Sequence, residues 1–212
     1  MNKFGYDLGI ASEGSFGPYQ LMPFVAINEE LVLLMDKKNN WSVFGRSQSF
    51  DTNFRAANIE TKKELEEFAK KAKFPSHGLI LKLSQYNTTD MKKGINDWDT
   101  LFNSFASMKK IQNKVWIETD MRAHLNPTRM LNIVSATEDL IRKLNSLCPN
   151  CFSPGFSVRK ADPGLPCSSC GLPTPSISVH HYQCLICNHM VSNVFPNGKE
   201  SEDPMYCNFC NP

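Results

Sequence analysis

Apolar residues recur with two different periods along the first 147 residues of the chain. In three stretches they lie three and four positions apart, as on one face of an α-helix. Each of these stretches follows a residue type that caps helix N-termini, namely Thr61, Asp97 and Asn126. Short apolar or alternating runs predict β-strands at 7–11, 30–36, 41–45, 78–83 and 114–119.

The predicted helix starts carry further local signals. Thr61 is followed three residues later by Glu64, which is the pattern of a capping box. Asn126 precedes Pro127, and proline is favoured at the first position of a helix. Because strands and helices alternate, we expect an α/β domain over residues 1–147, with a mixed sheet and helices on both of its faces.

The composition changes near Leu147, and we place a domain boundary there. All eight cysteines lie at or beyond residue 148, whereas all three tryptophans lie before it. The segment 148–212 has few large apolar side chains, so it needs a metal or disulfides to fold. The start of the chain lacks a signal-peptide pattern, and no stretch approaches the roughly 18 apolar residues of a membrane span. We therefore expect a cytoplasmic protein that does not bind membranes.

The cysteines form four CxxC pairs, each of which can direct two thiolates at one metal ion. Two such pairs make a tetrahedral site of four sulfurs, which is typical of structural zinc. Four disulfides would require a secreted protein, and equal CxxC pairs favour zinc over an iron–sulfur cluster. The predicted ligands of two structural zinc ions are Cys148, Cys151, Cys167, Cys170, Cys184, Cys187, Cys207 and Cys210.

The order in which the four pairs combine is a separate question. Turn residues at 163–166 and 196–198 indicate hairpins between the first and second pairs and between the third and fourth pairs. Short strands are predicted beside these turns, at 156–160 and 190–195. We therefore expect sequential ligation in tandem zinc ribbons at 148–175 and 182–212. A crossed arrangement is the alternative, with the first pair joining the third and the second joining the fourth.

The charge of the chain does not point to nucleic acid. The formal net charge is only +2, and the segment 148–212 contains more acidic than basic residues. Each zinc with four thiolates adds two negative charges to that segment. Because phosphate binding depends on clustered Lys and Arg, we expect the ribbons to serve folding and docking instead.

Two segments beside predicted strands look like functional loops. The first, 12–18, contains glycines that let the backbone approach a ligand closely, and its Glu13 is a candidate metal-binding carboxylate. The second, 119–126, contains Asp120 and leads into the third helix, whose N-terminus favours anions. In open α/β sheets, ligands bind at the carboxyl ends of strands. The residues expected to bind an anion there are Arg122, His124, Asn126 and Arg129.

Six stretches of the sequence are distinctive when taken together. They are IASEGSFGP (10–18), NEELVLLMD (28–36), FPSHGLI (74–80), KGINDWD (93–99), WIETDMRAHLNPTRM (116–130) and the ending DPMYCNFCNP. With the four CxxC pairs, they resemble an uncharacterised bacterial family, a domain of unknown function with a C-terminal pair of zinc ribbons. The resemblance implies no particular activity. Members of that family look longer at the N-terminus, so the chain is expected to be short by a strand and a helix.

The N-terminal part is also similar, more faintly, to the inosine triphosphate pyrophosphatase family. There an acidic residue after a strand holds magnesium, and the resemblance implies this role for Glu13. A Ser-His-Arg turn grips the nucleotide in that family, and RAHLNPTR (122–129) matches it only loosely. The implied chemistry is hydrolysis of a phosphoanhydride by water activated by magnesium, with Glu13 and either Asp120 or Asp36 as metal ligands.

Two functions are therefore expected from the sequence. In the first, the α/β domain binds a phosphorylated small molecule, most simply a nucleotide, and its enzymatic form hydrolyses a nucleoside triphosphate with magnesium. In the second, the protein is a non-enzymatic interaction or scaffold module, and the zinc ribbons are the surface that a protein partner contacts.

Overall fold

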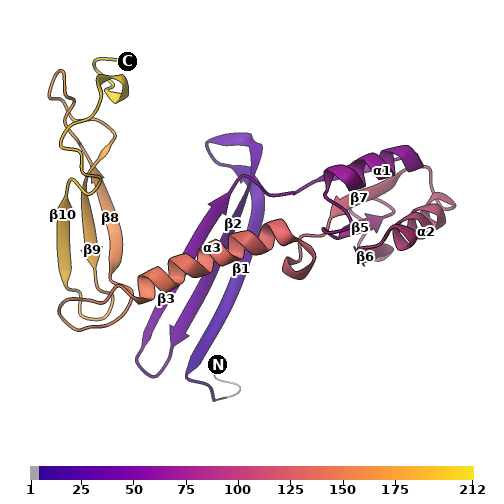
Figure 1. Cartoon of the computed structure of the whole chain (residues 1–212), viewed down its shortest axis with the longest axis horizontal. Coiled ribbons are helices and arrows are strands. Elements are labelled where there is room, and N and C mark those ends of the chain that lie inside the picture. Colours follow the sequence, from indigo (N-terminus) through magenta and orange to yellow (C-terminus); the bar gives the residue numbers. More distant parts are fainter. Residues whose placement is uncertain (1–4) are drawn as a thin grey trace. The chain divides into compact units, whose positions relative to one another are not determined.

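The computed structural model describes residues 5–212, and Figure 1 follows their course from the first strand to the C-terminus. Three antiparallel sheets and three α-helices make up this part of the chain. None of its helices is long and apolar enough to cross a membrane. The expected mixture of helices and strands is confirmed, but a single mixed sheet is wrong. Neighbouring strands all run antiparallel and are divided among separate sheets.

The first sheet is a meander with the strand order β1-β2-β3. Its strands are β1 (Leu8–Tyr19), β2 (Met22–Asp36) and β3 (Trp41–Ser49). The functional loop expected at 12–18 is wrong, because these residues continue β1. Small and polar residues interrupt the apolar alternation there, so hydrophobic periodicity does not predict this part of the strand.

The second sheet has the strand order β4-β7-β5-β6, and each neighbouring pair is antiparallel. Its chain order is β-α-β-β-α-β, as in split βαβ folds, so each helix connects two strands that flank a third. The elements are β4 (Ala56–Ile59), α1 (Lys62–Lys71), β5 (Leu79–Lys82), β6 (Met91–Ile95), α2 (Trp98–Lys109) and β7 (Val115–Thr119). Strands β4 and β6 were not predicted, since neither contains a strong apolar run.

Both helices of this sheet begin at the predicted caps. The backbone N–H of Glu64 donates to Thr61 Oγ1 at 3.2 Å, and the capping box is complete. The N–H of Thr100 donates to Asp97 Oδ1 at 2.8 Å. The helices bury apolar side chains against one face of the sheet, so the expectation of helices on both faces is wrong. The core includes Leu65, Leu79, Leu81, Leu101, Phe105, Val115 and Ile117.

Helix α3 (Pro127–Leu144) begins at Asn126, as predicted, because Asn126 Oδ1 accepts the N–H of Arg129 at 3.0 Å. Its buried face differs from the expected apolar stripe. Buried residues recur every four positions, at Thr128, Asn132, Ala136 and Leu140. The helix therefore turns a partly polar face inward.

The third sheet, with the strand order β10-β9-β8, lies in the cysteine-rich segment. It contains β8 (Ser157–Pro163), β9 (Ile177–Gln183) and β10 (Met190–Val194). The short strands indicated by the sequence near 156–160 and 190–195 are β8 and β10, whereas β9 was not predicted.

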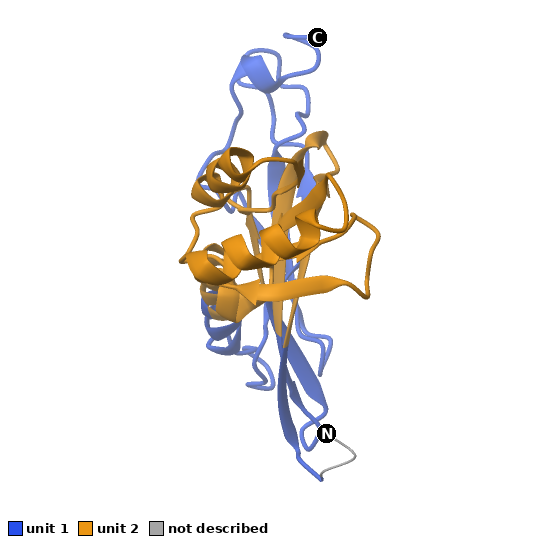
Figure 2. Cartoon of the chain, turned by 90° about the vertical axis from the view of Figure 1, so that its right-hand side faces the viewer, with its two compact units in different colours: residues 1–11, 33–45, 138–212 blue, residues 12–32, 46–137 orange. Residues whose placement is uncertain are grey.

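The chain forms two compact units, which Figure 2 shows in different colours. Unit 1 consists of Met1–Ala11, Leu33–Gly45 and Glu138–Pro212, and unit 2 of Ser12–Val32 and Arg46–Thr137. The third sheet thus belongs to unit 1, and the four-stranded sheet with its helices belongs to unit 2. The domain boundary near Leu147 stays a prediction.

A buried ion pair fixes part of unit 2. The Glu30 carboxylate is fully buried and accepts a 2.7 Å hydrogen bond from Nε of Arg129, whose side chain is 18% exposed. The amide of Asn28 donates to the same carboxylate at 2.9 Å, and Asn132 Nδ2 contacts Asn28 Oδ1. These contacts explain the polar inward face of α3, since an ion pair stripped of water needs further hydrogen bonds to be stable.

Gly14 of β1 leaves room for this ion pair. A Cβ atom at Gly14 would lie 2.3 Å from Oε1 of Glu30 and 2.4 Å from Nη2 of Arg129. Atoms cannot approach so closely, so the strand needs a residue without a side chain here. Because glycine is uncommon in strands, Gly14 also weakens the strand signal in the sequence.

We predict that Gly14→Ala lowers the free energy of unfolding by about 1–3 kcal/mol, as expected for overpacking. Urea denaturation of the zinc-loaded protein, followed by tryptophan fluorescence, would measure this loss. Gly17→Ala is the matched control on the same strand, because a Cβ there meets nothing within 4 Å. Equal effects of the two substitutions would contradict the explanation.

Candidate zinc centres and a candidate anion-binding cleft

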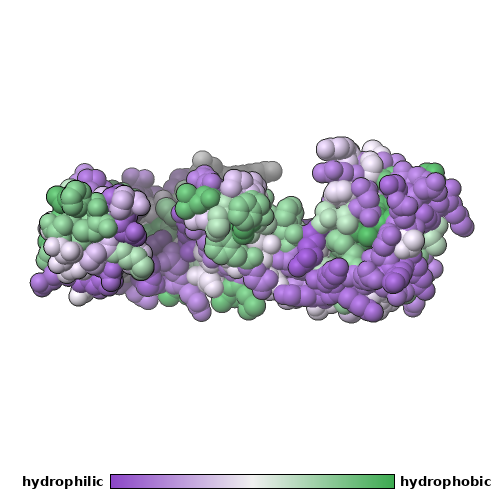
Figure 3. Space-filling model, turned by 90° about the horizontal axis from the view of Figure 1, so that it is seen from above, coloured by the Kyte–Doolittle hydropathy of each residue, from purple (hydrophilic) through white to green (hydrophobic). Residues whose placement is uncertain are grey.

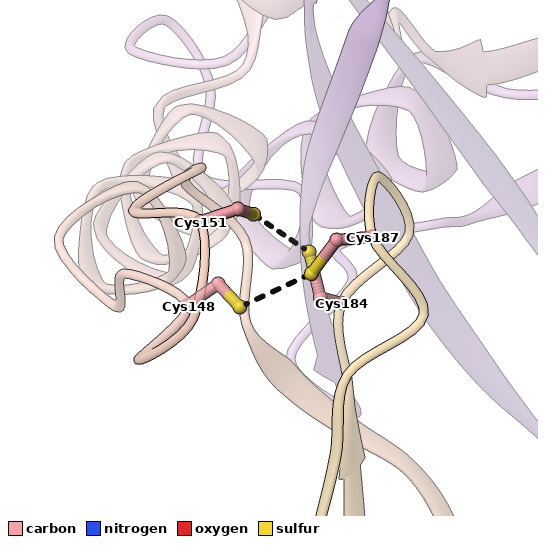
Figure 4. Close-up of side chains that lie close together, drawn as sticks. All are labelled: Cys148, Cys151, Cys184 and Cys187. Carbon is pink, nitrogen blue, oxygen red and sulfur yellow. Dashed lines mark hydrogen bonds between the residues drawn. The ribbon is translucent and has the colours of Figure 1, made fainter.

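The cysteine side chains of residues 148–212, called the zinc-ribbon segment here, converge at two places. Site A consists of Cys148, Cys151, Cys184 and Cys187. Site B consists of Cys167, Cys170, Cys207 and Cys210. Within each site the sulfur atoms all lie within 4.8 Å of one another. Figure 4 shows how two CxxC turns direct the sulfurs of site A toward one another. All eight cysteines predicted as ligands are thus used.

The predicted sequential pairing is wrong, and the crossed alternative is observed: the first CxxC pair meets the third, and the second meets the fourth. The unpredicted strand β9 explains this. Strands β8, β9 and β10 each occupy one gap between consecutive CxxC pairs, so each gap carries the chain from one end of the sheet to the other. Alternate pairs therefore meet at the same end. The ribbons expected at 148–175 and 182–212 are interleaved rather than successive.

The distances between sulfurs fit a single tetrahedral ion at each site. Between the two turns they are 3.6 and 3.7 Å in site A and 3.7 and 3.9 Å in site B. Zinc–sulfur bonds of about 2.3 Å separate tetrahedral ligands by about 3.8 Å. A disulfide would need about 2.05 Å, and all eight cysteines are free. Each site fits one structural zinc with no ligand position left for water.

Site A has hydrogen-bond donors around its sulfurs. The Cys151 thiol donates to Ser153 Oγ at 3.3 Å, and the hydroxyl becomes the donor once this sulfur is a thiolate. The side-chain amide of Asn150 donates to Cys187 Sγ at 3.6 Å. Hydrogen bonds from the hydroxyl and backbone of Ser153 lower the pKa of Cys151 to about 6, while burial raises the pKa of Cys184 to about 11. One thiol is thus ionised near neutral pH, and a bound metal displaces the other protons.

Site B is less shielded. Backbone N–H groups of Cys210 and Phe209 lower the pKa of Cys207 to about 7. The neighbouring Cys170 thiol is the main cause that raises the pKa of Cys210 to about 12. The side chains of Cys170 and Cys210 are exposed, whereas every cysteine of site A is buried or half-buried.

His181 of β9 has partners other than the cysteine clusters. His181 lies 2.9 Å from Ser192 Oγ through Nδ1 and 2.8 Å from Asp162 Oδ2 through Nε2. These contacts cross the third sheet from β8 to β10. Among residues 5–212, both metal clusters contain cysteine alone.

A cleft of about 730 Å³ lies in unit 2. Its floor includes Ile80 and Trp116 from the face of the four-stranded sheet opposite the helices, since the alternate residues Leu79 and Ile117 belong to the core. Aromatic rings line much of the rest, from Phe16, Phe54 and Tyr86. Its charged residues are Lys93, Glu118, Asp120, Arg122 and Arg129.

Arg122 is the best-placed cation of this cleft. Its Nε lies 3.0 Å from Asp120 Oδ1 and its Nη2 lies 2.6 Å from Oδ2, which makes a two-pronged pair. The Asp120 side chain is 1% exposed, but that of Arg122 is 48% exposed. Burial acts to raise the pKa of Asp120, yet hydrogen bonds from Arg122 outweigh it and lower the pKa. The ionised carboxylate therefore orients a cation that solvent can still reach.

A bulge in β6 completes this arrangement. Gly94 has a φ of +70°, and the pairing of β5 with β6 shifts register next to it. The shift frees the N–H of Gly94, which donates to Asp120 Oδ2 at 3.1 Å. Such bulges redirect backbone and side chains beside functional sites. Lys93, one residue earlier, lines the cleft.

The other residues predicted to bind an anion are less available. Arg129 lines the cleft, but Glu30 and the carbonyl of Met121 occupy its guanidinium. The first-turn N–H groups of α3 are also taken, because Thr128 donates to His77 Nε2 and Arg129 donates to Asn126. Burial is the main cause of a lowered pKa at His77, in keeping with a neutral ring that accepts this bond.

The remaining predicted residues do not gather in the cleft. Glu13 is exposed on β1, next to Gly14, which does line the cleft. His124 is exposed in the short 3-10 helix Ala123–Leu125 and is not part of the lining. Asp36 accepts the N–H of Asn39 in the turn after β2. Within residues 5–212, the two cysteine sites are the only clusters of three or more metal-ligating groups.

Sequence analysis missed several residues on which the cleft depends. Trp116 and Lys93 lie in motifs that were recognised, but they received no role. Asn28 and Glu30 occupy consecutive buried positions on one face of β2, and Val32 is the next buried residue on that face. Polar residues at inward positions of a strand are the signal that could have identified them.

The chain therefore belongs to the class of mixed α/β proteins with two four-cysteine metal sites. It matches a family described as a domain of unknown function (DUF6671) over residues 1–212, and it is a member of that family. No curated protein and no solved structure matches it.

We predict that Cys148→Ser makes Cys151, Cys184 and Cys187 more accessible to alkylation, while labelling of the site B thiols stays as in the wild-type protein. The reason is that Cys148→Ser removes a ligand from site A, whereas the zinc of site B keeps all four of its cysteines. N-ethylmaleimide labelling with mass spectrometry would identify the reactive thiols. Cys207→Ser is the matched control and should expose Cys167 instead. If Cys148→Ser exposes Cys167 instead, the crossed pairing is wrong and the sequential pairing is supported.

Proposed function

We propose that unit 2 binds a phosphorylated small molecule, most simply a nucleotide, in the cleft beside Arg122. The observation that carries the proposal is the pairing of a half-exposed arginine with a fully buried carboxylate. A guanidinium held in this way loses little side-chain freedom when an anion binds, and its planar fork matches phosphate oxygens. Lys93 supplies a second cation in the same cleft.

The aromatic lining supports a ligand that also has a flat ring. Phe16 and Phe54 stack with their ring centroids 5.9 Å apart, and Trp116 donates to Glu118 Oε2 at 2.8 Å. Lys82 pairs with the same carboxylate at 2.7 Å. A base could pack on these rings while its phosphates contact Arg122 and Lys93, since aromatic faces accept any base by stacking.

Hydrolysis with magnesium is not part of this proposal. Glu13 does not line the cleft, and the Asp120 carboxylate already binds Arg122 and the N–H of Gly94. A catalytic magnesium is usually held by one or two free carboxylates together with the phosphates of the substrate. Binding without turnover is therefore the form that the contacts support.

We predict that Arg122→Ala and Lys93→Ala each weaken ATP binding about 10–100-fold, the loss expected from about 1.5–3 kcal/mol per charged hydrogen bond. Isothermal titration with ATP and with adenosine would measure the affinity and its dependence on phosphate. Arg55→Ala is the control, because Arg55 is exposed and does not line the cleft.

Lys93 is exposed, so an effect of Lys93→Ala is not due to unfolding, whereas Arg122→Ala also leaves Asp120 buried without its partner. The proposal is wrong if the wild-type protein binds neither ATP nor any other nucleoside phosphate. It is equally wrong if Arg55→Ala weakens binding as much as Lys93→Ala.

A second candidate function is docking of a protein partner on the zinc-ribbon segment. The specific observation is that the CxxC turns present large apolar side chains to solvent. Phe152 and Phe209 are each 72% exposed and Leu185 is 58% exposed. Figure 3 shows apolar atoms gathered at the left of the view, over this segment. Phe152 and Leu185 directly follow Cys151 and Cys184, whose sulfur atoms are 3.6 Å apart. Neighbouring exposed apolar side chains of this kind are typical of protein interfaces.

For docking, we predict that Phe152→Ser with Leu185→Ser removes a partner protein from pull-downs of the full chain without loss of zinc. The effect follows from removing apolar contact area while all eight ligands are kept. Arg122→Ala should retain the partner, which separates this function from the cleft. Elemental analysis must find two zinc ions in each variant. If the wild-type chain retains no partner, docking is excluded.

A further inference from the structure

The two zinc sites differ in how well their sulfurs are protected. In site A, the Ser153 hydroxyl lies near Cys151 Sγ, the Asn150 amide lies near Cys187 Sγ, and neither sulfur is on an exposed residue. Site B offers no such side chains. Among residues 5–212, the sulfurs of Cys170 and Cys210 have only cysteine sulfurs within hydrogen-bond distance, at 3.7 and 3.9 Å.

This difference matters for the chemistry of a zinc-bound thiolate. Oxidants and alkylating agents attack the lone pairs of the sulfur, so reactivity follows thiolate character and access. Hydrogen bonds to sulfur draw charge away from it, and they are among the contacts that tune a metal site. A thiolate that lacks these donors and is also exposed is the first to react.

We propose that site B is a modification site for peroxides and other soft electrophiles, and that Cys170 and Cys210 are the residues attacked first. Site A remains as the structural metal centre. Site B lies in unit 1, so its oxidation does not depend on ligand binding in unit 2.

The reaction with a hydroperoxide balances as follows. The thiolate of Cys170 attacks one peroxide oxygen and becomes a sulfenic acid, and the other oxygen leaves as hydroxide. The thiolate of Cys207, 3.7 Å away, then displaces hydroxide from this sulfur and forms a disulfide. Cys210 reacts in the same way with Cys167. Each disulfide uses one peroxide, which takes two electrons from the two thiolates and becomes two hydroxide ions. Zn²⁺ leaves because its ligands are gone.

The surrounding contacts indicate that this change is local. Each new disulfide would join the same two CxxC turns that the metal joined. The N–H of Ser168 donates to the carbonyl of Glu202 at 2.9 Å, and the N–H of Glu202 donates to Pro166 at 2.8 Å. These backbone bonds hold the two segments together beside site B, so a thiol reductant and zinc should restore the original site.

The test uses the full chain loaded with two zinc ions. Hydrogen peroxide is added in modest excess, a chromogenic chelator records zinc release, and alkylation with mass spectrometry locates the oxidised cysteines. We expect one zinc to leave at least about tenfold faster than the other, with oxidation at Cys170, Cys210 and their partners in site B.

A second experiment removes the hydrogen-bonding side chains of site A. Ser153→Ala and Asn150→Ala should speed release of zinc from this site. Ser169→Ala is the matched control beside site B, because only its backbone N–H contacts a sulfur.

Several results would overturn the proposal. Release of both zinc ions at one rate, or release from site A first, would show that exposure and hydrogen bonding do not govern reactivity here. So would release of neither zinc at peroxide concentrations that oxidise a free model thiol. If the shield variants do not speed release from site A, the hydrogen bonds have no protective role.

Discussion

Two clusters of four cysteines, each of which fits a zinc ion, constrain how the C-terminal part of the chain can fold. The third sheet carries many exposed side chains, and all five residues of β10 are exposed. Hydrophobic burial therefore supplies little stability, and a metal must hold the sheet together. Because the two sites lie at opposite ends of the three strands, the position of each strand is fixed at both ends.

In unit 2, the main constraint is the placement of buried charge. Glu30 and Asp120 are both buried carboxylates, and each is satisfied by an arginine. The two pairs differ in how much of the arginine side chain stays exposed to solvent. Arg129 is enclosed and serves stability, whereas Arg122 keeps half of its side chain in solvent. A buried carboxylate is costly unless it is paired, so each one needs its arginine. Each pair also constrains a nearby glycine: Gly14 leaves space for the pair of Glu30 and Arg129, and the N–H of Gly94 donates to Asp120.

Local signals in the sequence predicted local structure well. The caps at Thr61, Asp97 and Asn126 marked the starts of all three α-helices of residues 5–212, and the CxxC pairs identified all eight cysteines. Properties that depend on distant contacts could not be read in this way. The partner of Arg129 is ninety-nine positions away in the sequence, at Glu30. The pairing of the cysteines depended on β9, whose mixture of His, Ser and Tyr with apolar residues gives only a weak strand signal.

The crossed pairing of the CxxC turns has a consequence for assembly. A zinc in site A closes the loop from Cys148 to Cys187, and this loop contains two of the four ligands of site B, Cys167 and Cys170. Neither half of the segment can form a complete centre without the other half, so the ribbons are not separable folding units. The first ion that binds also draws together the strands that carry the second set of ligands, and this lowers the entropy cost of closing the second loop. Binding of the first zinc should therefore raise the affinity of the segment for the second.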